Sequence, residues 1–281
     1  MFTLGCDRAY LYAHPERELT AEEIRHYDEA LARRTTGVPA QYITGHQEFW
    51  GLDLIVSPAV LTPRPETEHL VEAVLDLVSG ADSAQTQEQN QHQDQRPRTG
   101  VSAPHGPFVA HGLQIVDVGT GSGAIALALA TELAQAEIHA TDISPAALEV
   151  ARANAGRLGL ASRIEFHQAD LLSGFAAASF DLVISNPPYV GDSEEESVQL
   201  EVRKFEPRNA VFAGPTGLEV IERLIPQAYA ALRPGGWLVF EISGTIAGRV
   251  HASLSNPDWD KVAIRNDLQG IARVAMARKI P

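Results

Sequence analysis

Cysteine is almost missing from this sequence, since Cys6 is the single one among 281 residues. One cysteine cannot form an intramolecular disulfide bond, and no cysteine pair or cysteine–histidine cluster has the spacing of a zinc site. Long apolar runs are also missing. The stretch "AIALALA" at 124–130 is far shorter than the roughly 20 residues of a membrane-spanning helix, and the N-terminus has no basic-then-apolar signal. We therefore expect a cytoplasmic protein without a membrane segment or a metal ion.

Positive charge is scarce as well. The chain has 22 lysines and arginines against 36 aspartates and glutamates, which gives a formal net charge of -14. Such a charge argues against broad electrostatic capture of nucleic acid or of an anionic membrane, although a local basic patch stays possible. The composition is that of an ordinary soluble globular protein, and the length suits one large domain, or a large domain with a small appendage. A protein or small-molecule partner is favoured.

Residues 1–38 are predicted to form a small helical N-terminal domain. Thr20 is followed three residues later by Glu23, which is the spacing of a capping box at a helix start. The apolar residues that follow recur with helical periodicity and so share one face of an amphipathic helix, namely Ile24, Tyr27 and Leu31.

Residues 39–80 are predicted to form a β-hairpin and a connecting helix. Aromatic and β-branched residues surround Gly45 and Gly51, as in a hairpin, and Pro65 then lies in the first turn of an apolar-periodic stretch. Residues 81–112 are rich in Gln, Pro, Gly and Ser and have almost no large apolar side chain. We expect this stretch to be a disordered linker, because it cannot bury enough surface to offset the entropy of ordering.

Residues 113–281 alternate between strand-like and helix-like stretches. The order begins "LQIVDV", "SGAIALALATEL", "AEIHATD", "SPAALEVARANAGRLG", "RIEFHQAD" and "FDLVISN", and the chain closes with a pair of strand-like stretches. Such alternation predicts an α/β fold, in which a mostly parallel, Rossmann-like sheet of about seven strands has helices on both faces.

A glycine-rich turn, "DVGTGSG", follows the first of these strands. Ligands of parallel sheets bind outside the carboxyl ends of the strands, where this turn lies. Gly119, Gly121 and Gly123 allow a sharp turn and a close approach to a ligand, and Asp117 places a carboxylate beside them. Alone the motif is weak evidence. It can be read as a dinucleotide-binding pattern ending at Ala124, and a glycine turn can serve tight helix packing.

Acidic residues end the next two strands. Asp142 comes about 20 residues after the glycines, where a carboxylate can accept hydrogen bonds from both ribose hydroxyls of an adenosine. A role as a helix cap is less favoured for Asp142, because Ser144 already fills that position. At the next strand end Asp170 and Leu171 would contact the adenine, although an exposed turn aspartate explains Asp170 equally well.

The fourth strand ends in "NPPY". Pro187 restrains Asn186 to an extended conformation, and two adjacent prolines keep the backbone stiff with its carbonyls presented. The side-chain carbonyl of Asn186 and the backbone carbonyl of Pro187 can hold both hydrogens of a planar NH2 group and aim its nitrogen along one line. After Pro188, Tyr189 can stack on that planar group. An Asn-Pro turn after a strand is the plainer explanation, and the shared sheet edge favours function.

Together "DVGTGSG", "TDIS" and "NPPY" resemble the class I S-adenosylmethionine-dependent methyltransferases that modify an exocyclic or amide nitrogen. Three further stretches narrow the resemblance, at 39–72, 202–225 and 233–243. They are similar to the peptide chain release factor N5-glutamine methyltransferases, and the likeness spans the chain apart from the linker. It implies a seven-stranded methyltransferase domain behind a small helical domain. It also implies that the substrate is the glutamine of the Gly-Gly-Gln motif in class I release factors.

The resemblance also implies roles for individual residues. S-adenosylmethionine, with S-adenosylhomocysteine as product, would be bound by Gly119, Thr120, Gly121, Ser122, Gly123, Asp142, Leu171 and Asn186. The catalytic residues that hold the substrate glutamine would be Asn186, Pro187, Pro188 and Tyr189. Arg64 and Glu66 of "RPETE" would line the site or fix the hairpin to the main domain. The N-terminal part is shorter than the family leads us to expect, which fits a misplaced start or a reduced docking surface.

An amide nitrogen is a poor nucleophile, because its lone pair is delocalised into the carbonyl. No serine, cysteine or histidine in these motifs suggests a covalent route, so we expect direct in-line methyl transfer with the proton leaving to water. Glu241 is a candidate base, but a structural role is as plausible. An adenine-N6 methyltransferase remains an alternative that should show a basic groove. A nicotinamide oxidoreductase would leave "NPPY" unused, and a non-catalytic cofactor-binding module would bind cofactor without turnover.

Overall fold

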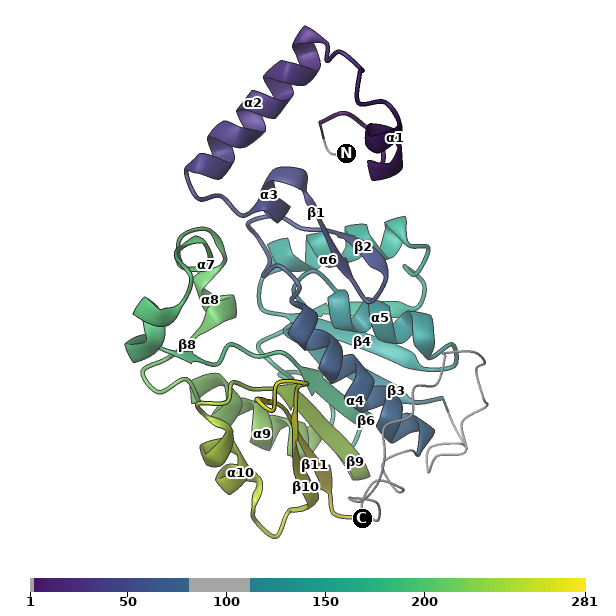
Figure 1. Cartoon of the computed structure of the whole chain (residues 1–281). Coiled ribbons are helices and arrows are strands. Elements are labelled where there is room, and N and C mark those ends of the chain that lie inside the picture. The colour runs from purple at the N-terminus through teal and green to yellow at the C-terminus, as the bar shows by residue number, and fades with distance from the viewer. Residues whose placement is uncertain (1–2, 81–111) are drawn as a thin grey trace, which may run out of the picture.

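The structure is a computed structural model of the whole chain, and it describes residues 3–80 and 112–281. The linker predicted over 81–112 lies outside the described residues, apart from Gly112. The predicted domain boundaries stay predictions. In the described part the chain forms an N-terminal helical segment, a hairpin, a long connecting helix and a large α/β unit (Figure 1).

The α/β unit is built around a seven-stranded sheet, as the alternation predicted. The strand order is β10-β11-β9-β6-β3-β4-β5, and β11 runs antiparallel to both of its neighbours. The remaining neighbouring pairs are parallel. The strands are β3 (Gln114–Val118), β4 (Glu137–Asp142), β5 (Ile164–Gln168), β6 (Phe180–Ser185), β9 (Leu232–Glu241), β10 (Trp259–Asn266) and β11 (Ala272–Lys279).

Helices pack on both faces of this sheet, so its central strands are apolar on both sides. One core cluster joins β-strand residues such as Ile115 and Leu182 to α4 and α5, with Ala155 of α6 in the same cluster. A second cluster joins Val116 and Val183 to α9 and α10 on the other face. The helices are α4 (Glu68–Ser79), α5 (Ala124–Glu132), α6 (Pro145–Arg157), α9 (Glu219–Ala231) and α10 (Ala247–Leu254).

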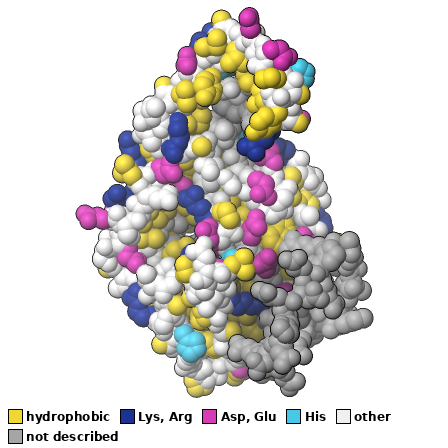
Figure 2. All heavy atoms as spheres, viewed as in Figure 1, with side chains coloured by type: hydrophobic (Ala, Val, Ile, Leu, Met, Phe, Trp, Pro, Cys, Tyr) yellow, Lys and Arg dark blue, Asp and Glu magenta, His cyan; other side chains and the backbone are white. Residues whose placement is uncertain are grey.

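The N-terminal segment contains α1 (Arg8–Ala13), α2 (Ala21–Thr35) and α3 (Ala40–Thr44). The predicted capping box is confirmed, because Glu23 N–H donates to the Thr20 hydroxyl and Thr20 N–H donates to the Glu23 carboxylate. The apolar face of α2 is not buried, however, and Figure 2 shows hydrophobic side chains on the surface of this segment at the top of the view. Its exposed large apolar side chains are Tyr10, Tyr12, Leu19, Ile24, Tyr27 and Leu31.

The predicted hairpin is formed by β1 (His46–Phe49) and β2 (Leu52–Ile55). Trp50 and Gly51 connect the two strands, and both have positive φ, at 54° and 73°, as a tight two-residue hairpin turn requires. The short helix η1 (Pro65–Thr67) then leads into α4, so the proline lies in the first turn as expected. This path leads the chain from the hairpin into α4, which packs on one face of the sheet.

A second segment outside the central sheet connects the end of β6 to the start of α9. It contains a short parallel pair, β7 (Val190–Gly191) and β8 (Phe212–Gly214), with η3 (Asp192–Ser197), α7 (Leu200–Phe205) and α8 (Arg208–Val211) between them. An ion pair of 2.8 Å between Arg34 and Glu201 links α7 to the end of α2. The segment thus connects the N-terminal helices to the carboxyl edge of the sheet.

Candidate functional site

Two neighbouring cavities open where the parallel strands end. The first has a volume of about 330 Å³ and is bordered by the glycine turn after β3, by Asp142 and by Leu171. The second has a volume of about 360 Å³ and is bordered by Tyr189 and Glu241. Both cavities share a wall formed by Leu61, Arg64, Asn186, Pro187, Pro188 and Ala210. A chemical group transferred from a molecule in one cavity to a molecule in the other would pass beside these shared residues.

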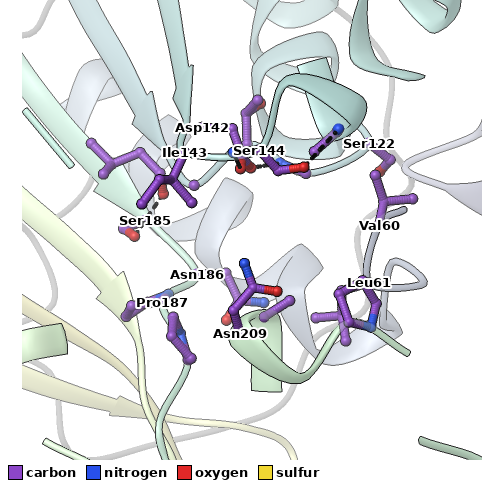
Figure 3. A pocket seen from close by; sticks show the side chains of 18 of the residues that line it. Val60, Leu61, Ser122, Asp142, Ile143, Ser144, Ser185, Asn186, Pro187 and Asn209 are labelled. Carbon is purple, nitrogen blue, oxygen red and sulfur yellow. Dashed lines mark hydrogen bonds between the residues drawn. The ribbon is translucent and has the colours of Figure 1, made fainter. Parts of the chain in front are cut away.

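Figure 3 shows the first cavity from close by. Its upper side carries Ser122, Asp142, Ile143 and Ser144, and its lower side carries Asn186, Pro187 and Asn209. Of the predicted cofactor-binding residues, all but one border this cavity, namely Gly119, Thr120, Gly121, Ser122, Asp142, Leu171 and Asn186. The structure therefore brings together residues from four separate strand ends.

The glycine turn has two functions in this structure. Gly119 and Gly121 have φ of 73° and 55°, and a Cβ atom at either position would meet no atom within 4 Å, so both border open space. Gly123 differs, because a Cβ there would lie 3.3 Å from the Cβ of Ala151 on α6 and 3.1 Å from Leu127. It is not among the residues bordering the cavity. Two glycines thus leave room for a ligand, and the third allows α5 to pack closely on α6.

Asp142 connects the glycine turn to the start of α6. Its carboxylate accepts hydrogen bonds from the backbone N–H of Gly121 at 2.9 Å and of Ser144 at 2.9 Å. Ser144 itself caps α6 by accepting from Ala147 N–H at 3.2 Å, as the sequence predicted. Burial raises the pKa of Asp142, while these backbone donors oppose the shift. The carboxylate is held in place at the rim of the cavity.

Asp117 lies below the turn and is fully buried. Its Oδ2 atom accepts from the Thr120 hydroxyl at 2.6 Å and from Ala126 N–H at 3.2 Å. Its Oδ1 atom has no hydrogen-bond partner among the described residues. Burial raises the pKa of Asp117 to about 7. This aspartate fixes the turn from inside the protein and does not border the cavity.

Leu171 is held in an uncommon backbone conformation. Its φ is 54°, in the left-handed region that a branched residue seldom adopts, and its carbonyl accepts from the Thr141 hydroxyl at 3.0 Å. Such strain concentrates at functional sites. Asp170 also borders the cavity, but its carboxylate pairs with Arg223 of α9. That arginine was not foreseen from the sequence.

A hydrogen-bonded chain orients Asn186. The Thr67 hydroxyl donates its single proton to Glu241 Oε2 at 2.6 Å, so its oxygen can accept from Asn186 Nδ2, which lies 3.1 Å away. The amide nitrogen of Asn186 is thereby directed toward η1. Among the described residues, no group donates a hydrogen bond to the carbonyl oxygen of Asn186, so this oxygen can accept from a ligand.

Tyr189 ends the same chain. Its hydroxyl donates to Glu241 Oε1 at 2.9 Å, so both oxygens of this buried carboxylate accept from hydroxyl groups. Burial raises the pKa of both Tyr189 and Glu241. Tyr189 borders the second cavity together with Asn186, Pro187 and Pro188, and it does not border the first. Through these two hydrogen bonds, Glu241 helps to hold the "NPPY" segment in place.

Arg64 and Glu66 occupy different positions. Arg64 borders both cavities and forms an ion pair of 2.6 Å with Glu206, whose side chain is 1% exposed. Glu66 borders the second cavity. Arg64 thus both lines the site and ties the segment after the hairpin to the segment before α8.

Several residues of the cavities were not assigned from the sequence. Thr67 lies within the "RPETE" stretch, and Asn209 within "FEPRNAVFAG", so both belong to stretches that carried the family resemblance. The positions of their side chains depend on long-range packing, because Thr67 and Asn186 are 119 residues apart. Val60 and Leu61 form an apolar side of the first cavity, which the hairpin assignment did not indicate.

Within residues 3–80 and 112–281, no helix is both long and apolar enough to cross a membrane. Two family models match the chain. They are described as the methyltransferase small domain, over residues 107–204, and the PrmC N-terminal domain, over residues 1–45.

The chain is similar to proteins named release factor glutamine methyltransferase. It is 49% identical to that of Koribacter versatilis over 280 residues, which cover 99% of this chain and 88% of the relative. It is 42% identical to that of Moorella thermoacetica over 235 residues, covering 84% and 72%. It is 36% identical to that of Xylella fastidiosa strain Temecula1 over 278 residues, covering 99% and 90%.

Two solved structures share the fold at low sequence identity. A methyltransferase from Pyrococcus furiosus matches with a TM-score of 0.53 and 16% identity, over 91% of this chain and 95% of that one. A ribosomal protein L11 methylase from Lactobacillus delbrueckii subsp. bulgaricus matches with a TM-score of 0.50 and 20% identity, over 80% and 84%.

Proposed function

The chain belongs to the release factor glutamine methyltransferases, and we propose that it methylates N5 of the glutamine in the Gly-Gly-Gln motif of class I release factors. It is an S-adenosylmethionine-dependent methyltransferase, and S-adenosylhomocysteine is the second product. The proposal places the enzyme in the cytoplasm, where release factors act. The observation that carries it is the pair of cavities joined at Asn186, Pro187 and Pro188.

The residues around the first cavity suit the cofactor. Open space beside Gly119 and Gly121 lets the backbone approach a ligand, and Asp142 presents a fixed carboxylate at the rim. Leu171 adds an apolar surface for a flat ring. When bound, S-adenosylmethionine supplies an electrophilic methyl group on a sulfonium. We assign its binding to Gly119, Thr120, Gly121, Ser122, Asp142, Leu171 and Asn186, and we assign to Gly123 a packing role that supports the turn.

The second cavity is the proposed place of the substrate glutamine. The free carbonyl oxygen of Asn186 and the backbone carbonyl of Pro187 can accept the two N–H bonds of the glutamine amide. Two acceptors at fixed positions orient the nitrogen lone pair along one line and stabilise positive charge that develops on nitrogen. Pro188 keeps the segment stiff, and Tyr189 provides an aromatic side for the planar amide.

The surrounding residues do not favour a general base at this position. Both oxygens of Glu241 already accept hydrogen bonds, from Thr67 and Tyr189. The methylated nitrogen can lose its proton to water once the new bond has formed. Orientation of the amide by Asn186 and Pro187 is therefore the main contribution of the protein to the rate.

The test is methyl transfer from labelled S-adenosylmethionine to a purified class I release factor. A release factor whose motif glutamine is replaced by alanine serves as the matched control, and mass spectrometry locates the label. We expect one methyl group on the motif glutamine and none on the control. Equal labelling of both proteins, or transfer to an adenine-containing nucleic acid instead, contradicts the proposal and leaves the methyltransferase fold unaffected.

A further inference from the structure

Three potential metal ligands converge on adjacent strands outside both cavities. His139 lies on β4, and Glu165 and His167 lie on β5. The register of this parallel pair places His139 opposite Glu165 and Thr141 opposite His167. Because residues two apart on a strand share a face, all three side chains stand on the same side of the sheet. None of them borders either cavity.

One ligand atom from each of the three side chains lies within 4.8 Å of the other two, close to the spacing that a tetrahedral metal requires. His139 Nδ1 and His167 Nε2 are 3.1 Å apart. Glu165 Oε2 lies 3.5 Å from His139 Nδ1, and Glu165 Oε1 lies 3.6 Å from His167 Nε2. Zinc binds imidazole nitrogen and carboxylate oxygen at roughly 2.0–2.2 Å, which separates tetrahedral ligand atoms by about 3.3 Å. One ion could therefore contact all three side chains with small adjustments.

The surroundings of the cluster also suit a bound ion. The rings of Phe175 and Phe180 pack edge-on against His139 and restrict its orientation. The side chains of His139 and His167 are 19% and 29% exposed, whereas that of Glu165 is 68% exposed. Two ligands thus come from a half-buried apolar setting, and the third faces solvent. A water molecule can reach the fourth position from the solvent side.

A hydrogen bond between two neutral imidazoles is the competing explanation. It accounts for the 3.1 Å separation of the two nitrogen atoms. It leaves the carboxylate of Glu165, whose side chain is 68% exposed, to water or to a protonated imidazole. A cation at the centre satisfies all three groups at once. The formal net charge of -14 also favours retention of a cation.

We propose that His139, Glu165 and His167 bind one zinc ion. Imidazole and carboxylate ligands suit borderline divalent metals, whereas Mg²⁺ and Ca²⁺ prefer sites made of oxygen ligands. The ion would fasten the edge strand β5 to β4, beside the strand ends that carry Asp142 and Leu171. The site is not apparent from sequence spacing, because its two histidines are 28 residues apart and meet through strand register.

The test is zinc binding by the metal-free full chain, prepared without a histidine tag and titrated with Zn²⁺ against a chromophoric chelator. We expect one equivalent to bind, with a rise in Tm of about 5 °C at saturation and no comparable rise with Mg²⁺. Replacing the ligands in H139Q or H167Q should weaken binding at least tenfold. H69Q should bind as the wild type does, because His69 pairs with Glu72 but belongs to no group of three potential metal ligands among the described residues.

A further control addresses the histidines between residues 81 and 111, which the structure does not describe. The triple variant H92Q/H105Q/H111Q should keep the high-affinity equivalent. Absorption of Co²⁺ in the wild-type site should show the intensity of tetrahedral coordination, a readout that needs no variant to fold. No saturable equivalent in the wild type, or its loss in the triple variant with retention in H139Q, would overturn the proposal.

Discussion

The helices α5 and α2 represent two ways in which this chain forms a helix. Seven residues of α5, from Ala124 to Ala130, are buried between the sheet and its neighbours. None of the residues of α2 is buried, and its start is fixed by a capping box. The first helix is stabilised by tertiary packing, whereas the second depends on local hydrogen bonds and on surface ion pairs such as Arg25–Glu29. The site therefore lies in the tightly packed unit, whereas the apolar face of α2 in the N-terminal segment is exposed to solvent.

Carboxylates in the two regions differ in the same way. Burial raises the pKa of Asp117 and of Glu241 in the packed unit. The pKa of Glu23 in the capping box is lowered, first by the backbone N–H of Thr20. Protonation of the carboxylate therefore favours the folded state at Asp117 and Glu241 and disfavours it at Glu23.

The largest effect is expected at Asn186, which the packed unit holds in place. Asn186→Ala removes one of the two proposed acceptors of the substrate amide, and we expect the rate of methyl transfer to fall by about 10³-fold. Cofactor affinity, measured by calorimetry, should fall by no more than about tenfold, because the six other residues assigned to the cofactor stay in place. Asn209→Ala, at the exposed mouth of the same cavity, should reduce the rate by about tenfold or less. Similar losses in the two variants would argue against a specific orienting role.

Two leucines compare the helices directly. Leu127 of α5 is fully buried, whereas Leu31 of α2 is 44% exposed. Leu127→Ala should lower the free energy of unfolding by about 3 kcal/mol, because it leaves a cavity in the core. Leu31→Ala should cost less than about 0.5 kcal/mol. Urea denaturation of both variants measures the difference, and equal costs would show that α2 packs more tightly than its exposure indicates.

The dependence of the unfolding free energy on pH should show the raised pKa of Asp117. Its pKa in the folded protein is raised to about 7, above the value of about 3.9 expected in the unfolded chain. The folded state therefore keeps this proton to higher pH, and the associated stability is complete below about pH 4 and is lost as the pH rises to about 7. We expect a fall of about 3 kcal/mol between pH 5 and pH 8. Asp117→Asn should flatten this part of the curve, measured by urea denaturation at each pH.

Thr67 tests whether the hydrogen-bonded chain positions Asn186. Thr67→Val keeps the shape but removes both hydrogen bonds, so the Asn186 amide can turn. We expect kcat to fall by about tenfold with little change in the KM for the release factor, since about 1.4 kcal/mol of orientation is lost. Thr67→Ser should restore the rate, because it returns the hydroxyl group. An unchanged kcat in the valine variant would remove Thr67 from the proposed chain.

The smallest effect is expected at the start of α2. Thr20→Ala removes the side-chain acceptor of the capping box, which contributes about 1 kcal/mol to the local stability of a helix. Amide hydrogen exchange should become faster in the first turn of α2 and stay unchanged in α5. A lower global unfolding midpoint, with faster exchange in both helices, would indicate that α2 is coupled to the core.

The sequence predicted features that depend on neighbouring residues and on strand direction. The capping box at Thr20 and the turn around Gly51 follow from local spacing, and both are present. The meeting of the glycine turn, Asp142 and Asn186 at one edge follows because parallel strands of one sheet end on the same side. These features needed no knowledge of how the helices pack.

Tertiary structure decided the contacts between distant segments. The direction of the Asn186 amide depends on Thr67 and Glu241, which reach it from η1 and β9. The packing role of Gly123 depends on how closely α6 approaches α5, and the exposure of the α2 apolar face depends on what lies against it. Periodicity in a sequence records which face of an element is apolar, but which element covers that face is set by packing across the whole chain.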